Sequence, residues 1–151
     1  MFDKILISSC FLGQKVRYNG KVQPLLDPLL IQWQKEARLM SICPEIVGGL
    51  AVPRAPAERQ GGEIITILGE NVTQQFTSGA MAALALCQQH NIRFALLKES
   101  SPSCGSDTIY DGTFKGKKIK GQGLCSQLLR QYGIQVFSEL TINQLVLLLD
   151  R

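Results

Sequence analysis

The sequence predicts an α/β protein, built as one three-layer domain around a mostly parallel sheet. Short apolar runs that fit buried strands alternate along the chain with longer stretches of helical spacing, which is typical of βαβ units. The length of 151 residues suits a single domain, and we expect residues 1–151 to form it. The composition, 45% hydrophobic and 19% charged, is that of an ordinary globular protein.

Strands are predicted where short apolar or alternating runs lie between turn residues. The run at 93–97 is apolar enough to be central, whereas 63–68 alternates and fits an edge. The second strand must stop before Pro44, which cannot donate to a ladder. Asp111-Gly112 lies between two β-like runs and predicts a small hairpin over 109–119. The main strands are expected at 5–9, 39–42, 63–68, 93–97 and 134–137.

Helices are predicted where apolar residues recur every three or four positions. Gly133 would close the third helix in the C′ position, and Thr141 would cap the start of the last. Residues 48–62, with two arginines, are expected to be a long irregular loop, a kind of segment that is often functional. The helices are expected at 24–38, 72–90, 123–132 and 141–150. With the strands they predict a Rossmann-like arrangement with helices on both faces of the sheet.

The charge balance favours a small anionic ligand. There are 16 basic and 12 acidic residues, a net charge of +4, and the basic residues are scattered. Their one cluster, between Lys115 and Lys120, alternates with glycine, which argues against a nucleic-acid partner. No signal peptide is recognised, and the longest apolar run, 145–149, is far too short to cross a bilayer. We therefore expect a cytoplasmic protein with no membrane partner.

Five cysteines in such a protein indicate metal or catalytic chemistry rather than disulfides. Cys87 and Cys125 lie on apolar helix faces and are expected in the core. Cys10, Cys43 and Cys104 each follow a predicted strand. Since parallel strands end at the same edge of a sheet, these three thiols can meet at one point.

The residues alone leave two interpretations open: three unrelated thiols, or a metal centre. A zinc site usually takes a fourth protein ligand, and the only histidine, His90, ends a helix away from the three loops. A thiol trio without histidine points to an iron–sulfur cluster. The sequence has no Gly-x-Gly-x-x-Gly after the first strand and no Gly-x-x-x-x-Gly-Lys-Ser/Thr, so dinucleotide and triphosphate sites are unsupported.

Three stretches around these cysteines carry a family resemblance. They are Ser8-Ser9-Cys10-Phe11-Leu12-Gly13, Cys43-Pro44-Glu45-Ile46-Val47-Gly48-Gly49-Leu50 and Lys98-Glu99-Ser100-Ser101-Pro102-Ser103-Cys104-Gly105. With them the chain resembles the thiouracil desulfidase (TudS) family, formerly a bacterial domain of unknown function, over nearly its whole length. The resemblance implies an iron–sulfur-dependent enzyme that converts thiouracil or a thiouridine nucleotide to the uracil form and releases sulfide.

The resemblance also implies roles for individual residues. Cys10, Cys43 and Cys104 would hold a [4Fe-4S] cluster, and the iron without a cysteine ligand would bind the substrate sulfur. Glu45 and Ser101 would be catalytic: a carboxylate can move protons, and a hydroxyl can orient water. As alternatives, Glu45 would cap a loop and Ser101 would be a turn residue.

Substrate binding is expected from Ser103, Arg17, Tyr18 and Arg54, for a small thiolated pyrimidine base or nucleotide. Arginine binds phosphate through its planar fork, although surface pairing with Glu58 or Glu63 explains these arginines equally well. Tyr18 would stack on a pyrimidine or else pack at the rim of the core. Ser100 departs from the family pattern, where a basic or another polar residue is expected, so the choice among Ser100, Ser101 and Ser103 stays open.

Two other functions compete with the desulfidase. One is a non-catalytic iron–sulfur binding or sensing protein. The other is a metal-free enzyme with Cys10 or Cys104 as nucleophile, against which the lack of a well-placed histidine counts.

Overall fold

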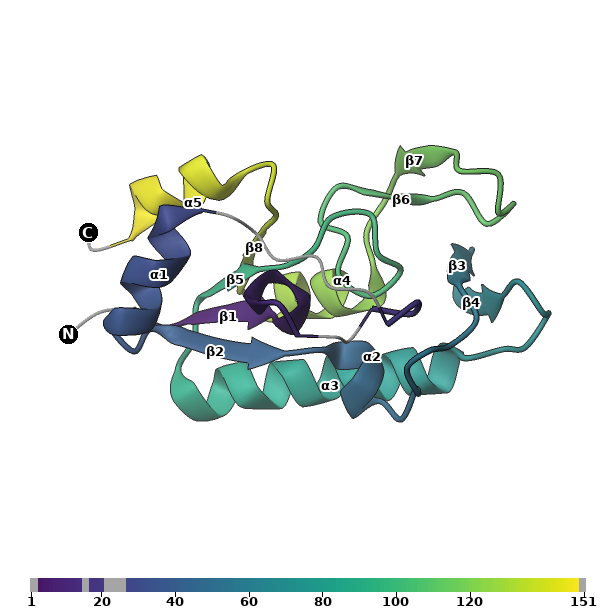
Figure 1. Ribbon diagram of the computed structural model, residues 1–151, viewed down its shortest axis with the longest axis horizontal. Coiled ribbons are helices and arrows are strands. Elements are labelled where there is room, and N and C mark those ends of the chain that lie inside the picture. The colour runs from purple at the N-terminus through teal and green to yellow at the C-terminus, as the bar shows by residue number, and fades with distance from the viewer. Residues whose placement is uncertain (1–2, 15–16, 21–26, 150–151) are drawn as a thin grey trace.

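A parallel four-stranded sheet forms the centre of the protein. The structure is a computed structural model that describes residues 3–14, 17–20 and 27–149 (Figure 1). The strand order is β2-β1-β5-β8, and every neighbouring pair is parallel. The predicted α/β class with a mostly parallel sheet is thus confirmed. The strands are β1 (Ile5–Ser8), β2 (Leu39–Ile42), β5 (Phe94–Leu96) and β8 (Gln135–Phe137).

Helices cover both faces of this sheet, because successive side chains of a strand point to opposite sides. Leu6 of β1 packs in a core with α3 (Thr73–His90) and α4 (Leu124–Gln131). Its neighbours Ile5 and Ile7 pack in a second core with α1 (Pro28–Lys35) and α5 (Ile142–Leu148). The result is the predicted three-layer arrangement.

The ends of two helices differ from the prediction. Helix α1 begins at Pro28, where the Asp27 side chain caps it by accepting the Leu29 N–H at 2.9 Å. It ends at Lys35, since Ala37 has a φ of 55°, a conformation that a right-handed helix cannot include. Residues 24–26, where this helix was predicted to begin, lie outside the described part of the chain. Thr141 occupies the predicted N-cap position of α5, but its side chain makes no capping hydrogen bond there.

The Thr141 hydroxyl instead accepts the N–H of Ser138 at 2.9 Å, in the turn that leads into α5. The last predicted residue of this helix, 150, lies outside the described residues. Gly133 follows α4 with a φ of 82°, as the predicted C′ position requires.

The predicted irregular loop at 48–62 contains a strand. Strand β3 (Ala57–Gln60) pairs antiparallel with β4 (Glu63–Thr66) across a tight turn, so residues 57–60 are a correction to the prediction. The predicted hairpin is confirmed as β6 (Thr108–Tyr110) and β7 (Lys118–Lys120), but it is joined by a longer connection than Asp111-Gly112 alone.

The carboxyl edge of the main sheet gathers the irregular segments. A 3₁₀ turn, η1 (Ser9–Leu12), follows β1, the short helix α2 (Pro44–Val47) follows β2, and the loop after Leu96 follows β5. The two small sheets lie beyond this edge (Figure 1). In the described part of the chain, no helix combines the length and the apolarity that a membrane crossing needs.

Candidate active site

A cavity of about 780 Å³ opens at the carboxyl edge of the main sheet. This volume lies within the range of roughly 300–1,000 Å³ that is usual for ligand sites. Ser103 is the one site residue named from the sequence that does not line it. The cavity brings together Cys10, Cys43, Cys104, Glu45, Ser101, Arg17, Tyr18 and Arg54.

The three thiols come from three separate elements. Cys10 lies in η1, Cys43 is the N-cap residue of α2, and Cys104 lies in the loop after β5. All five cysteines of the chain are free thiols. Among the described residues, no three His, Cys, Asp or Glu side chains are close enough to hold one metal ion.

Burial disfavours the charged form of each of these thiols. It raises the pKa of Cys10 to about 11, with a further contribution from the neighbouring Cys43. Burial likewise raises the pKa of Cys43, and that of Cys104 well above its usual range. Lys98 and Arg17 oppose the effect at Cys10, since a nearby positive charge lowers a thiol pKa. Only a strongly cationic partner would make all three thiolates stable together.

The second thiol is positioned by unusually close backbone packing of α2 on α3. A Cβ on Gly79 of α3 would lie 1.8 Å from the carbonyl oxygen of Pro44. A Cβ on Gly48 would lie 1.9 Å from the carbonyl oxygen of Gln75. Only glycine allows these approaches. The two glycines therefore determine the position of α2, and with it the position of its N-cap residue Cys43. A helix-interior glycine such as Gly79 is a signal that sequence reasoning could have used.

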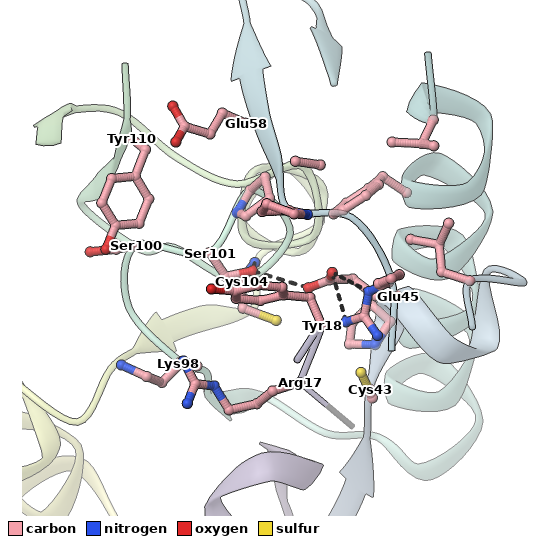
Figure 2. A pocket seen from close by; sticks show the side chains of 18 of the residues that line it. Arg17, Tyr18, Cys43, Glu45, Glu58, Lys98, Ser100, Ser101, Cys104 and Tyr110 are labelled. Carbon is pink, nitrogen blue, oxygen red and sulfur yellow. Dashed lines mark hydrogen bonds and ion pairs between the residues drawn. The ribbon is translucent and has the colours of Figure 1, made fainter. Parts of the chain in front are cut away.

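The Glu45 carboxylate binds Arg54 through one oxygen and Ser101 through the other, and Figure 2 shows it pointing toward Ser101. Its Oε1 accepts from Nη2 of Arg54 at 2.9 Å and from Nε at 3.3 Å. Its Oε2 accepts from the Ser101 hydroxyl at 3.4 Å. Arg54 also donates from Nη1 to the carbonyl of Ala51 at 3.1 Å. Arg54 thus pairs with Glu45, an acid of the site, rather than with Glu58 or Glu63.

The loop that carries Cys104 is organised by side-chain hydrogen bonds to its own backbone. The Ser101 hydroxyl oxygen accepts the N–H groups of Ser103 and Cys104, each at 3.1 Å. Ser100 has a φ of 69°, and its hydroxyl shares a 3.0 Å hydrogen bond with Thr108. Of the serines considered from the sequence, Ser101 is therefore the one whose hydroxyl contacts Glu45.

Ser103 lies beneath the cavity rather than in it. It is fully buried, and its carbonyl accepts the N–H of Cys125 at 2.8 Å at the start of α4. A Cβ on Gly123 would lie 2.4 Å from that carbonyl, so the loop and α4 touch through their backbones. Within the described part of the chain, the buried Ser103 hydroxyl has no hydrogen-bond partner.

The remaining wall of the cavity includes residues that sequence reasoning did not assign. Lys98 forms a 2.5 Å ion pair with Glu139, and Glu99 and Glu58 also line the cavity. Lys98 and Glu99 belong to one of the stretches that carry the family resemblance, so this resemblance could have identified them as residues of the site. Tyr18 is 40% exposed, and its carbonyl accepts the Arg54 N–H at 2.7 Å.

Comparison with known proteins agrees with this arrangement. The sequence profile of the 2-thiouracil desulfurase family matches residues 5–141. The chain belongs to this family. The predicted family is thereby confirmed, and with it the prediction that the protein is a desulfidase enzyme.

Two relatives of this 2-thiouracil desulfurase family member cover nearly its whole length. A protein of Bacillus subtilis (strain 168), called uncharacterized protein YbbK, is 41% identical and spans 94% of this chain and 99% of its own. A solved structure described as the [4Fe-4S]-dependent thiouracil desulfidase TudS is 50% identical. It superimposes with a TM-score of 0.95 over 96% of each chain, so the fold is shared in full.

Proposed function

We propose that this protein is a [4Fe-4S]-dependent desulfidase that converts thiouracil or a thiouridine nucleotide to the uracil form. The observation that carries the proposal is the cavity in which three thiols from three strand ends meet Glu45. The named activity of the 50% identical relative supports it. We place the enzyme in the cytoplasm, where five free thiols stay reduced.

The donor set fits an iron–sulfur cluster. Cys10, Cys43 and Cys104 would hold it: they are soft ligands, and burial leaves each of them poorly suited to carry a charge alone. When bound through three cysteines, such a cluster supplies an iron free to act as a Lewis acid towards the sulfur of a thiocarbonyl.

Glu45 and Ser101 handle the water in this proposal. Replacing C=S by C=O consumes one water: its oxygen adds to the ring carbon, and its two protons leave with the sulfur as hydrogen sulfide, or as hydrosulfide and a proton released to solvent. Arg54 binds Oε1 of Glu45, so Oε2 is the oxygen free to accept a proton. The Ser101 hydroxyl, which accepts two backbone N–H groups and donates to Oε2, orients this carboxylate oxygen for the water.

The substrate is a small thiolated pyrimidine base or nucleotide. The Tyr18 ring, at the exposed rim, offers a surface for stacking, and the Arg17 guanidinium offers a charge for a phosphate. Arg54 contributes indirectly, through Glu45, and Ser103 contributes through the backbone of the loop beneath the cavity.

The experiment is anaerobic reconstitution, followed by iron analysis and sulfide release from 4-thiouracil, 2-thiouracil and the thiolated monophosphate. A matched pair of variants separates the cavity thiols from the core thiols. Cys43→Ala should lose the brown colour and the iron, whereas Cys87→Ala, on the core-facing side of α3, should keep both. A colourless, iron-free wild type from an iron-replete host would contradict the proposal.

A non-catalytic iron–sulfur sensor predicts the same colour but no turnover. Glu45→Gln distinguishes the two, because its amide cannot accept a proton at physiological pH while it keeps the size of the side chain. Desulfidase activity predicts that sulfide release falls and the iron content stays. Unchanged behaviour of the variant, with no thiolated base consumed by the wild type, would favour the sensor.

A further inference from the structure

A second buried carboxylate lines the cavity, and the reaction proposed above does not use it. Glu58, on β3, is only 9% exposed. In the view of Figure 2, Glu58 and Tyr110 lie on one side of Cys104, and Cys43 lies on the other. Glu58 therefore faces a part of the cavity away from the Cys43 thiol and the Glu45 carboxylate.

One oxygen of Glu58 anchors the connection of the β6–β7 hairpin. Its Oε1 accepts the N–H of Gly112 at 2.9 Å and that of Phe114 at 3.2 Å. Both donors have positive φ angles, 95° and 59°, and such a conformation is uncommon for phenylalanine. Gln60, on the same strand, donates to the Gly112 carbonyl at 2.9 Å. The position of the Glu58 carboxylate is thus set by the backbone of a neighbouring hairpin.

The other oxygen, Oε2, receives no hydrogen bond from the residues that the structure describes. The basic side chains around it have other partners: Lys118 lies over the Tyr110 ring at 5.6 Å, and Arg59 donates to the carbonyls of Gly61 and Gln122. Oε2 is not among the buried side-chain atoms without a partner in the described part of the chain, so it is accessible from the cavity that Glu58 lines. Oε2 is therefore available for a donor that enters the cavity.

We propose that Glu58 determines specificity by accepting, through Oε2, a hydrogen bond from an N–H or O–H group of the substrate. The inference rests on the proposed function, since it concerns the substrate of that same cavity. An ionised carboxylate only accepts, so it selects a donor and disfavours a phosphate or a carbonyl at this place. A thiolated pyrimidine offers two kinds of such donor: the ring N–H groups, two in the free base and one in a nucleoside, and the hydroxyls of the nucleoside sugar.

Glu58→Gln tests this assignment at a single atom. The amide oxygen can keep both backbone N–H groups, and this fixes the NH₂ group where Oε2 was, so an acceptor becomes a donor. The matched control is Glu63→Gln on the adjacent strand, an exposed carboxylate bonded to Asn71. The reconstituted holoenzymes are assayed with 4-thiouracil and 4-thiouridine, and binding of uracil and uridine is measured by calorimetry.

The expected result is a loss of about tenfold or more in kcat/KM and in product affinity, the usual size for a hydrogen bond to a charged group. A loss with both base and nucleoside identifies the ring N–H as the donor, and a loss with the nucleoside alone identifies a sugar hydroxyl. Values within twofold of the Glu63→Gln control for every probe would overturn the proposal.

Two further measurements separate this inference from the proposed function. If the wild type releases no sulfide, the proposed function fails, while product binding by wild type and variant still tests Glu58. If Glu58→Gln does not fold, the wild type is assayed with N-methylated 4-thiouracil and with 2′,3′-dideoxy-4-thiouridine. Removing the donor from the substrate should then cause the same loss, and full activity on both analogues would overturn the assignment.

Discussion

Replacing Glu99 should weaken the loop that carries Cys104. The Glu99 carboxylate is buried, and its Oε1 accepts four backbone N–H groups. The distances are 3.1 Å from Ser100, 2.7 Å from Ser106, 3.2 Å from Asp107 and 3.3 Å from Thr108. Its Oε2 accepts the Ser106 hydroxyl at 2.7 Å. One side chain therefore satisfies most of the polar backbone of this turn.

Two variants bracket the size of the effect. Glu99→Ala leaves the four N–H groups without their acceptor. Each buried N–H group that water cannot reach costs about 1–3 kcal/mol, so two such groups already lower the free energy of unfolding by ~2–6 kcal/mol. Glu99→Gln keeps an acceptor but loses the charge, which should lower the free energy of unfolding by about 1 kcal/mol. In a domain of this size, each kcal/mol corresponds to a fall in Tm of roughly 2–4 °C.

The Glu99 contribution should also depend on pH. Burial raises the pKa of Glu99, but hydrogen bonds from the Ser106 side chain and from the backbone of Asp107 outweigh it, so the pKa lies below its usual value. The carboxylate is thus more acidic in the folded than in the unfolded chain. Its stabilisation is complete above the unfolded pKa, near 4.5, and is lost as the pH falls through the folded value.

The assay is urea unfolding followed by circular dichroism at pH 7 and at pH 4, for wild type, both Glu99 variants and the exposed control Glu63→Gln. The stability difference between wild type and Glu99→Gln should shrink at the lower pH. An equal difference at both values would refute the titration argument. A Glu99→Ala protein as stable as wild type would refute the hydrogen-bond argument.

Two more predictions concern contacts that position Glu45 and the segment around it. Arg54→Lys should lower kcat about tenfold with little change in KM, because the fork that holds Glu45 is lost; a rise in KM alone would instead indicate direct substrate binding by Arg54. Gly79→Ala should destabilise the protein by about 1–3 kcal/mol and lower its iron content, because the new Cβ meets the Pro44 carbonyl. The control Gly62→Ala, in an open turn, should stay near wild type. Thermal unfolding and iron analysis measure both variants.

Much of the central fold could be predicted because strands buried on both faces consist of apolar residues, and such apolar runs can be recognised in the sequence. The run at 93–97 is apolar on both sides, and β5 is indeed an interior strand with a helix layer on each face. Strand β3 could not be predicted in this way, since Ala57–Gln60 is mostly polar and only Glu58 of this strand is buried. The apolar residue that joins the small sheet to a core is Ile64 of the partner strand β4, which packs with Val72 and Phe76.

The candidate site likewise has one part that could be predicted from the sequence and another that could not. The meeting of Cys10, Cys43 and Cys104 follows from parallel strands that end at one edge, which topology alone predicts. The contact of Arg54 with Glu45 does not, because it depends on how the loop between α2 and β3 turns back, and nothing local in the sequence specifies that. The burial of Ser103 was hidden for a similar reason: it results from close packing of the loop on α4 at Gly123.

The contact between α2 and α3 has a consequence for motion. Where Pro44 meets Gly79, backbone lies on backbone, so no side chain is present to change rotamer and absorb a small displacement. Tightly packed interiors transmit strain rather than dissipate it. The segment from Cys43 to Glu45 should therefore fluctuate together with the longest helix of the protein, and its amide protons should exchange with solvent as slowly as those of that helix rather than at the rates of a surface loop.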